Sequence, residues 1–264
     1  MDTKVAVVTG ASSGIGLSSA IALISKGYTV YDLSRRDFLH EKIKHIKCDV
    51  SVYESVQKAI DQVIKDSGRI DLLVTSAGFG VAGAVEFMDI SDAKNQLDVN
   101  FFGTVNAVKA VLPYMRNKNK GRIICISSVA AAIPIPFQTY YSVSKAAVNS
   151  FVLALSNEIK PFGVSICSVM PGDIKTGFTS SRKTDLSGNE IYENRIKRSV
   201  LVMENDEING MSPDKVAVFI TKLIEKRRVK PIYAIGLKYK LFVLLSIILP
   251  KKAVSAIVAS LYAR

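Results

Sequence analysis

The sequence predicts an α/β fold, in which one doubly wound parallel sheet carries helices on both faces. Short apolar runs that are typical of buried strands alternate with longer stretches of helical periodicity. The chain has 264 residues, 48% of them hydrophobic, which is enough to form one full core. Because no internal repeat and no low-complexity linker interrupts the chain, we predict a single domain over residues 1–264.

A glycine-rich turn joins the first predicted strand, residues 4–9, to a helix that ends at Lys26-Gly27. The turn comprises Gly10, Ala11, Ser12, Ser13, Gly14, Ile15 and Gly16. Glycines at such a place let the backbone approach a pyrophosphate, and the helix N-terminus favours its negative charge. Strand, turn and helix together predict a dinucleotide site of Rossmann type.

The second strand, expected at residues 28–33, bears on the choice of cofactor. In an enzyme that uses NAD, a carboxylate near the end of this strand binds the ribose hydroxyls. Ser34 stands at that place here, followed by Arg35 and Arg36, and two guanidinium groups suit a 2′-phosphate. We therefore predict NADP(H). Two alternatives stay open: Asp32 is the ribose ligand if the register differs by two residues, or the arginines are a solvated basic turn.

The alternation of strands and helices continues to the end of the sheet. The predicted strands lie at 46–50, 71–76, 123–127, 164–170 and 231–235, and two predicted helices lie at 54–65 and 91–115. A further helix contains Tyr141 and Lys145 and runs to about Pro161, and the next helix begins after a cap at Ser212. Asn100 lies in the middle of the helix at 91–115, and a buried asparagine there needs a polar role. The segment at 175–209 is polar with little periodicity, so we predict an irregular substrate loop within 173–212, over the site.

Tyr141 and Lys145 are candidates for acid–base chemistry. Four residues apart on a helix, they share one face, and a nearby ammonium group favours the phenolate and lowers its pKa. Tyr114 and Lys118 have the same spacing, but they stand beside a polar run where a helix should end, so we interpret that pair as solvated surface.

Ser128 is the third candidate, since it follows an apolar strand and precedes Tyr141 by 13 residues. A serine at a strand end can donate a hydrogen bond to a substrate oxygen. The alternative without chemistry is a helix-capping serine and a surface Tyr/Lys pair.

The cysteines and the distribution of charge indicate the compartment of the protein and the kinds of partner that it has. Cys48, Cys125 and Cys167 lie in or next to apolar runs without metal spacing, which is typical of buried thiols in a reducing compartment. We expect no metal site, no nucleic-acid partner and, from residues 1–4, no signal peptide. The net charge is +12, and residues 215–264 hold eleven Lys/Arg against one acid, Glu225. The basic excess is therefore concentrated in the tail.

Taken together, these residues resemble the short-chain dehydrogenase/reductase family from about residue 4 to residue 235. TGASSGIG matches the family's cofactor loop, DVNFFGT its asparagine motif, ISS and YSVSK its catalytic pair, and PGDIKT its nicotinamide-side motif. One departure is Thr75-Ser76-Ala77-Gly78, where the family usually has Asn-Asn-Ala-Gly.

The resemblance implies a role for each matched residue. Tyr141 would be the general acid/base, and Lys145 would lower its pKa and hold the nicotinamide ribose. Ser128 would bind the substrate oxygen, and Asn100 would anchor a water relay. The further implied cofactor contacts are Asp49 and Val50 at the adenine, Ile174 and Thr176 at the carboxamide, and Ala77, Gly78, Pro171 and Gly172.

The stretches around these motifs look most like hydroxysteroid dehydrogenases and acyl-ketone reductases. We therefore predict an NADP(H)-dependent, cytoplasmic oxidoreductase that interconverts a secondary alcohol and a ketone on a small lipophilic substrate, such as a hydroxysteroid or bile acid. The alternatives are a keto-lipid or retinoid reductase and, in another class, a non-catalytic NADP-binding regulator. The family implies a homodimer or homotetramer through the helices around Asn100 and Tyr141.

The tail, residues 237–264, is both apolar and basic. Residues 241–249 are apolar at eight of nine places and are bracketed by lysines, and a second apolar stretch follows Pro250. Neither stretch reaches the ~20 residues of a membrane span. We expect two short helices near the substrate entrance. They either pack over the pocket or on a subunit, or make peripheral contact with a membrane surface.

Overall fold

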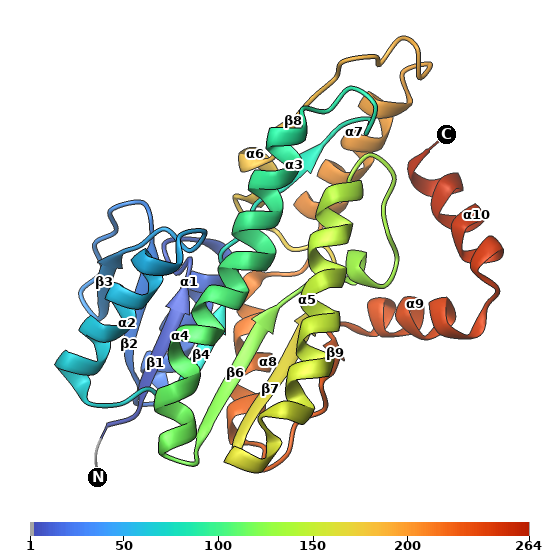
Figure 1. Cartoon of the computed structure of the whole chain (residues 1–264). Helices are drawn as coiled ribbons and strands as arrows, with labels where there is room; N and C mark the ends of the chain where they lie inside the picture. The colour runs from blue at the N-terminus through green and yellow to red at the C-terminus, as the bar shows by residue number, and fades with distance from the viewer. Residues whose placement is uncertain (1–2, 264) are drawn as a thin grey trace.

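The computed structural model describes residues 3–263, so that Met1, Asp2 and the predicted last residue of the tail, Arg264, lie outside it. A seven-stranded sheet, parallel throughout, has the strand order β3-β2-β1-β4-β6-β7-β9 (Figure 1). Its strands are β1 (Val5–Thr9), β2 (Thr29–Ser34), β3 (Ile43–Lys47), β4 (Leu72–Thr75), β6 (Gly121–Ile126), β7 (Val164–Met170) and β9 (Ile232–Ala234). The order confirms the doubly wound parallel sheet.

Helices cover both faces of this sheet. The helices of the described chain are α1 (Gly14–Ser25), α2 (Tyr53–Ser67), α3 (Ile90–Leu97), α4 (Gly103–Asn117), α5 (Thr139–Glu158), α6 (Phe178–Ser181), α7 (Arg195–Ile208), α8 (Pro213–Glu225), α9 (Leu237–Ile248) and α10 (Lys251–Tyr262). A separate pair, β5 (Val81–Ala82) and β8 (Lys183–Thr184), lies at the end of the sheet near α3 and α6. α2, α4 and α5 pack on one face, and α1 and α8 on the other.

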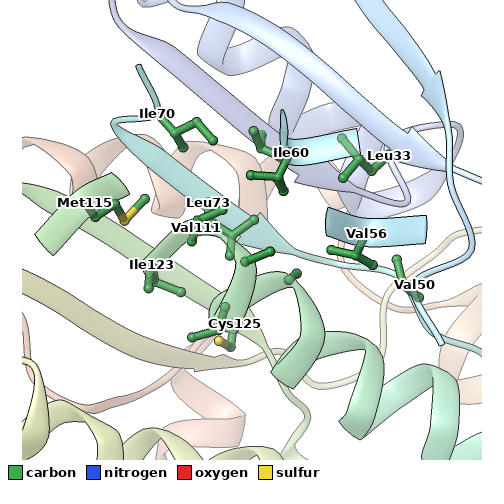
Figure 2. Close-up of a cluster of buried hydrophobic side chains, with 14 of the residues drawn as sticks. Leu33, Val50, Val56, Ile60, Ile70, Leu73, Val111, Met115, Ile123 and Cys125 are labelled. Carbon is green, nitrogen blue, oxygen red and sulfur yellow. The ribbon is translucent and has the colours of Figure 1, made fainter. Parts of the chain in front are cut away.

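The hydrophobic core has two parts, one on each face of the sheet, and both are built from the same types of side chain. Strands buried on both faces carry continuous β-branched and apolar runs, as a covered parallel sheet requires. Figure 2 shows part of the first core, where Leu73 and Ile123 of the sheet meet Ile60 of α2 and Val111 of α4, all fully buried. All three cysteines are free and buried, as predicted.

The structure corrects three predicted elements. The third strand lies at Ile43–Lys47, not at 46–50, because Asp49 accepts hydrogen bonds from the Ser51 amide and hydroxyl and so forms a turn. This edge strand is only half buried, and its apolar signal is weak. The helix predicted at 91–115 is interrupted by a π-helical turn, Asp98–Phe102, which contains Asn100. Such turns are often found at functional sites.

The third correction concerns the segment predicted to be irregular. It contains the 14-residue helix α7, whose buried side chains Ile196, Val200 and Met203 recur at helical spacing. With so few apolar side chains among charged ones, the periodicity is faint. The cap of the next helix is as predicted, since the Ser212 hydroxyl accepts from the Asp214 amide.

Candidate active site

The main cavity opens at the carboxyl ends of β1 and β4, where the strand order of the sheet reverses. Ligands bind at this place in open parallel sheets. The cavity has a volume of about 1070 Å³. Its lining includes Gly10, Ser12, Ser13, Gly14, Ile15, Arg35, Arg36, Val50, Ala77, Gly78, Ser128, Tyr141, Lys145, Pro171, Gly172, Ile174 and Thr176. The structure therefore brings together most of the predicted site residues.

The glycine turn has the shape of a phosphate cradle. Gly10 has a φ of 72°, and a Cβ there would lie 2.9 Å from the Ala77 Cα, so only glycine fits between the two loops. Gly16 does not line the cavity. A Cβ on it would collide with the Gly10 carbonyl oxygen, so its role is to let α1 pack against the turn. The open backbone of the turn fits the phosphates of a dinucleotide.

The end of β2 decides between the two candidate ribose ligands. Asp32 is fully buried, and its carboxylate accepts hydrogen bonds from the Ala11 amide at 2.7 Å and from the Ser34 hydroxyl at 2.7 Å. His45 Nδ1 lies 2.8 Å from the same carboxylate. Asp32 is thus committed to holding the turn, whereas Arg35 and Arg36 line the cavity. Their guanidinium groups fit a 2′-phosphate.

Besides Gly16, the predicted contacts Asp49 and Asn100 lie outside the cavity lining. The Asp49 carboxylate turns away to Ser51, and only its neighbour Val50 faces the cavity. Asn100 is completely buried behind the cavity wall, where its Nδ2 donates to the Phe79 carbonyl at 3.0 Å and to the Ser144 hydroxyl at 3.1 Å. A Cβ built on Gly78 would lie 2.9 Å from Asn100 Oδ1 and 3.6 Å from Lys145 Nζ. The amide and the ammonium group therefore flank the same glycine.

The candidates Ser128, Tyr141 and Lys145 come from the loop after β6 and from α5. Ser128 follows β6 and accepts a hydrogen bond of 3.1 Å from the Ala130 amide, which caps a short 3₁₀ turn. The same serine lines the cavity, so it is both a capping residue and a cavity residue. Tyr141 and Lys145 lie on one face of α5, and Lys145 Nζ is 5.8 Å from the centre of the Tyr141 ring. Lys145 Nζ donates to the Ile126 carbonyl at 3.0 Å, which joins α5 to β6.

Electrostatics corrects the predicted effect of Lys145 on Tyr141. In the free protein, burial raises the pKa of Tyr141 to about 12, against a lowering contribution from its hydrogen bond with Ser128. Burial also lowers the pKa of Lys145 to about 8. Desolvation thus outweighs the lowering effects of Ser128 and Arg182 on the pKa of Tyr141, and the Lys145 ammonium group donates to a strand carbonyl. The phenol is in its protonated form at neutral pH.

A second, narrower cavity of about 210 Å³ opens next to the first. The two share Ser128, Tyr141, Gly172 and Asp173. The remaining walls are mostly apolar and include Val129, Ile133 and Ile135 after β6, Phe242 and Leu245 of α9, Leu249 just after it, and Val254, Val258 and Leu261 of α10. The predicted helices of the tail therefore close one side of a pocket that leads to the catalytic hydroxyls.

Sequence reasoning missed several residues around Tyr141. The Phe178 ring lies 5.5 Å from the Tyr141 ring, and Glu207 of α7 lines the main cavity and pairs with the buried Arg182. These residues belong to the segment predicted to be irregular, which offered no local signal. Asp173 was also missed, although the PGD turn pointed to it. Burial raises the pKa of its carboxyl, which accepts a hydrogen bond of 2.6 Å from the Tyr239 hydroxyl of α9.

Comparison with known proteins agrees with this geometry. Residues 4–187 match the family model described as short chain dehydrogenase. A 3-ketodihydrosphingosine reductase of Bacteroides thetaiotaomicron is 40% identical over 230 residues, which cover 86% of each chain. A probable short-chain type dehydrogenase/reductase of Helicobacter pylori is 34% identical over 251 residues, 93% of each chain.

Solved structures agree as well. A short-chain dehydrogenase from Streptomyces avermitilis superposes with a TM-score of 0.84 at 26% identity, covering 98% of this chain and 96% of that one. An alcohol dehydrogenase from Thermococcus sibiricus, complexed with 5-hydroxy-NADP, has a TM-score of 0.71 at 25% identity and covers 89% and 95%.

Proposed function

Because the chain belongs to the short-chain dehydrogenase family, we propose that it interconverts a ketone and a secondary alcohol on a long-chain lipid, with NADP(H) as its cofactor. The observation that carries the proposal is the narrow apolar cavity that ends at Ser128 and Tyr141. Its apolar walls suit the part of an acyl chain next to the ketone, because the methylene groups held there are removed from water. Arg35 and Arg36 in the main cavity support NADP(H).

The residues of the chain account for the handling of the oxygen. Ser128 and Tyr141 both face the shared part of the two cavities, where their hydroxyls would bind the ketone oxygen. The reduced cofactor would supply the hydride. Tyr141 would give its proton to the oxygen, and since its pKa is raised to about 12 the phenol carries that proton at neutral pH. Lys145 and Asn100 would hold α5 and the wall at Gly78 in place.

Asp173 favours one kind of keto-lipid. Its carboxylate lies where the two cavities meet, and burial raises its pKa. An ammonium group beside the ketone would relieve the cost of burying that charge. A 3-ketosphingoid base has such a group on the carbon next to its ketone, and a relative at 40% identity is named a 3-ketodihydrosphingosine reductase. We therefore place keto-lipids before hydroxysteroids, bile acids and retinoids.

A substrate panel with cavity-filling variants tests the proposal. Purified protein with NADPH should turn over long-chain 3-ketosphingoid bases, more slowly as the chain shortens, and should be slower with ketosteroids. Leu245→Trp and Val258→Trp fill the narrow cavity and should abolish long-chain turnover while a small ketone is still reduced. Val218→Trp on the exposed face of α8 is the control. Ketosteroid turnover above that of every keto-lipid would reverse the order, and silence with all ketones would favour the non-catalytic NADP-binding alternative.

A further inference from the structure

Helix α9 presents two apolar faces, one that lines the narrow cavity and one that stays half or more exposed. Tyr239, Phe242 and Leu249 point into the narrow cavity. Leu237, Leu241, Leu244 and Ile248, spaced four, three and four residues apart, share another face of the helix. We call these four the outer face of α9. They are 51–87% exposed.

Packing on the chain itself does not remove this apolar surface from water. Leu241, Leu244, Ile247 and Ile248 stay 51–73% exposed, and even Phe242 and Leu245, which line the narrow cavity, stay 38% and 37% exposed. Figure 1 shows α9 and α10, in red, outside the β9 edge of the sheet, away from the helices that cover its two faces. A soluble chain rarely leaves a continuous stripe of this kind without a partner.

The charge around the stripe indicates the partner. Lys238 and Lys240 stand in the first turn of α9, and Lys251 and Lys252 begin α10. All four are exposed, and no aspartate or glutamate occurs in residues 237–264. Apolar side chains flanked by lysines match the boundary between acyl chains and anionic headgroups.

We propose that the outer face of α9 docks on a membrane that contains anionic lipids. The helix would lie in the plane of the interface, with Lys240 and Lys252 at the headgroups. Within residues 3–263, no helix is long and apolar enough to cross a bilayer, so the contact is peripheral. The opposite side of the same helix is a wall of the narrow cavity. If the proposed keto-lipid activity holds, substrate would pass from the bilayer around α9 to Tyr141 without crossing bulk water.

Vesicle sedimentation with the full chain tests the docking without any measurement of turnover. The probes are vesicles of phosphatidylcholine alone and of an equimolar mixture with phosphatidylglycerol. The chain should bind the mixture, and high salt should weaken the binding. Lys240→Gln with Lys252→Gln should weaken it about 30-fold at low salt, from about fivefold per lysine. Lys58→Gln with Lys120→Gln, two exposed lysines elsewhere, is the matched control and should bind like wild type.

A second variant separates the apolar contribution. Leu241→Ser, Leu244→Ser and Ile248→Ser together should reduce binding at least about tenfold, while circular dichroism and the turnover of a small, soluble ketone stay unchanged. Absence of binding to anionic vesicles overturns the proposal, as does equal binding by the variants and the control. A second copy of the chain is the other occupant of the face. A dimer that the triple serine variant converts to monomer, with no vesicle binding, would also overturn it.

Discussion

The backbone amide of Ala11 donates a hydrogen bond of 2.7 Å to the carboxylate of Asp32. This bond ties the glycine turn to the end of β2, near the position where NAD enzymes bind the ribose. The Ser34 hydroxyl donates to the other oxygen of Asp32, and the side chain is fully buried. Ser34, Arg35 and Arg36 line the cavity at this end.

We expect Arg35→Ala with Arg36→Ala to weaken NADP(H) binding at least about 100-fold and NAD(H) binding little. The reason is that hydrogen bonds to a charged phosphate are each worth about 1.5–3 kcal/mol, and only NADP(H) carries the 2′-phosphate. Fluorescence titration with both cofactors measures the difference. Lys42→Ala, an exposed cation in the same loop, is the control. Equal losses for both cofactors would show that the arginines do not contact the phosphate.

Asp32→Asn tests whether Asp32 has a structural role and is not a ligand of the ribose. The exchange removes a buried charge that accepts from Ala11 and Ser34, so we expect a loss of about 2 kcal/mol in the free energy of unfolding. The ratio of NADP(H) to NAD(H) affinity should not change. Urea denaturation and the same titrations measure both quantities, and a shift of the ratio towards NADP(H) would instead assign Asp32 to the ribose.

Tyr141→Phe removes one hydroxyl from the shared wall of the two cavities. We expect turnover to fall by a factor of about 10²–10⁴, because proton transfer loses its positioned acid, while cofactor affinity is kept. Tyr140→Phe on the neighbouring turn of α5 lines neither cavity and serves as the control. Turnover of the Tyr141 variant close to wild type would remove the residue from the mechanism.

Lys145→Met should make the protein more stable at neutral pH. The pKa of Lys145 falls from 10.5 to about 8 on folding, so the folded state bears the full cost of the buried charge below pH 8. Between these two values the unfolded chain binds more protons, and the stability of wild type rises with pH. The advantage of the variant, about 3 kcal/mol at pH 7, should shrink towards pH 10.5.

Urea denaturation of wild type and variant across this pH range measures that difference, with Lys58→Met as the exposed control. All other titrating groups are common to the compared proteins and cancel. A difference in stability that does not change with pH would mean that Lys145 is solvated in the folded protein.

Asp173→Asn should affect an amino ketone more than a neutral ketone. We expect KM for a 3-ketosphingoid base to rise about tenfold, since the ammonium group loses its carboxylate, and KM for a neutral long-chain ketone to change little. Asp206→Asn is the matched control, because Asp206 accepts from Tyr262 of α10 at 3.0 Å as Asp173 does from Tyr239 but lines neither cavity. Equal changes for both ketones would leave Asp173 a purely structural anchor of α9.

The homodimer or homotetramer stays a prediction. Phe102, Val143 and Leu153 lie on the helical path around Asn100 and on α5, and each is 46–49% exposed. If these helices pair across a two-fold axis, Leu153→Asp should shift the mass in light scattering towards the monomer. This face is distinct from the outer face of α9.

Local sequence determined the parts of this protein whose signal lies within one or two elements. The strand and turn at 4–16 predicted the cradle, because glycine spacing next to an apolar strand has one common use. The cap at Ser212 and the Tyr141–Lys145 face of α5 followed from the same short-range rules. The tail was predicted as two short helices, and α9 and α10 are those helices.

Only the tertiary structure decided which polar groups make hydrogen bonds within the fold and which face the cavity. Asp32 and Asp49 are carboxylates near strand ends, and only the folded chain shows that they accept hydrogen bonds from the amides of Ala11 and Ser51. The pKa of Tyr141 depends on burial by distant segments, which a four-residue spacing does not contain. Desolvation and cavity shape are sums over residues far apart in the chain. That is why the apolar pocket between the Ser128 loop and α9 appears only once the chain has folded.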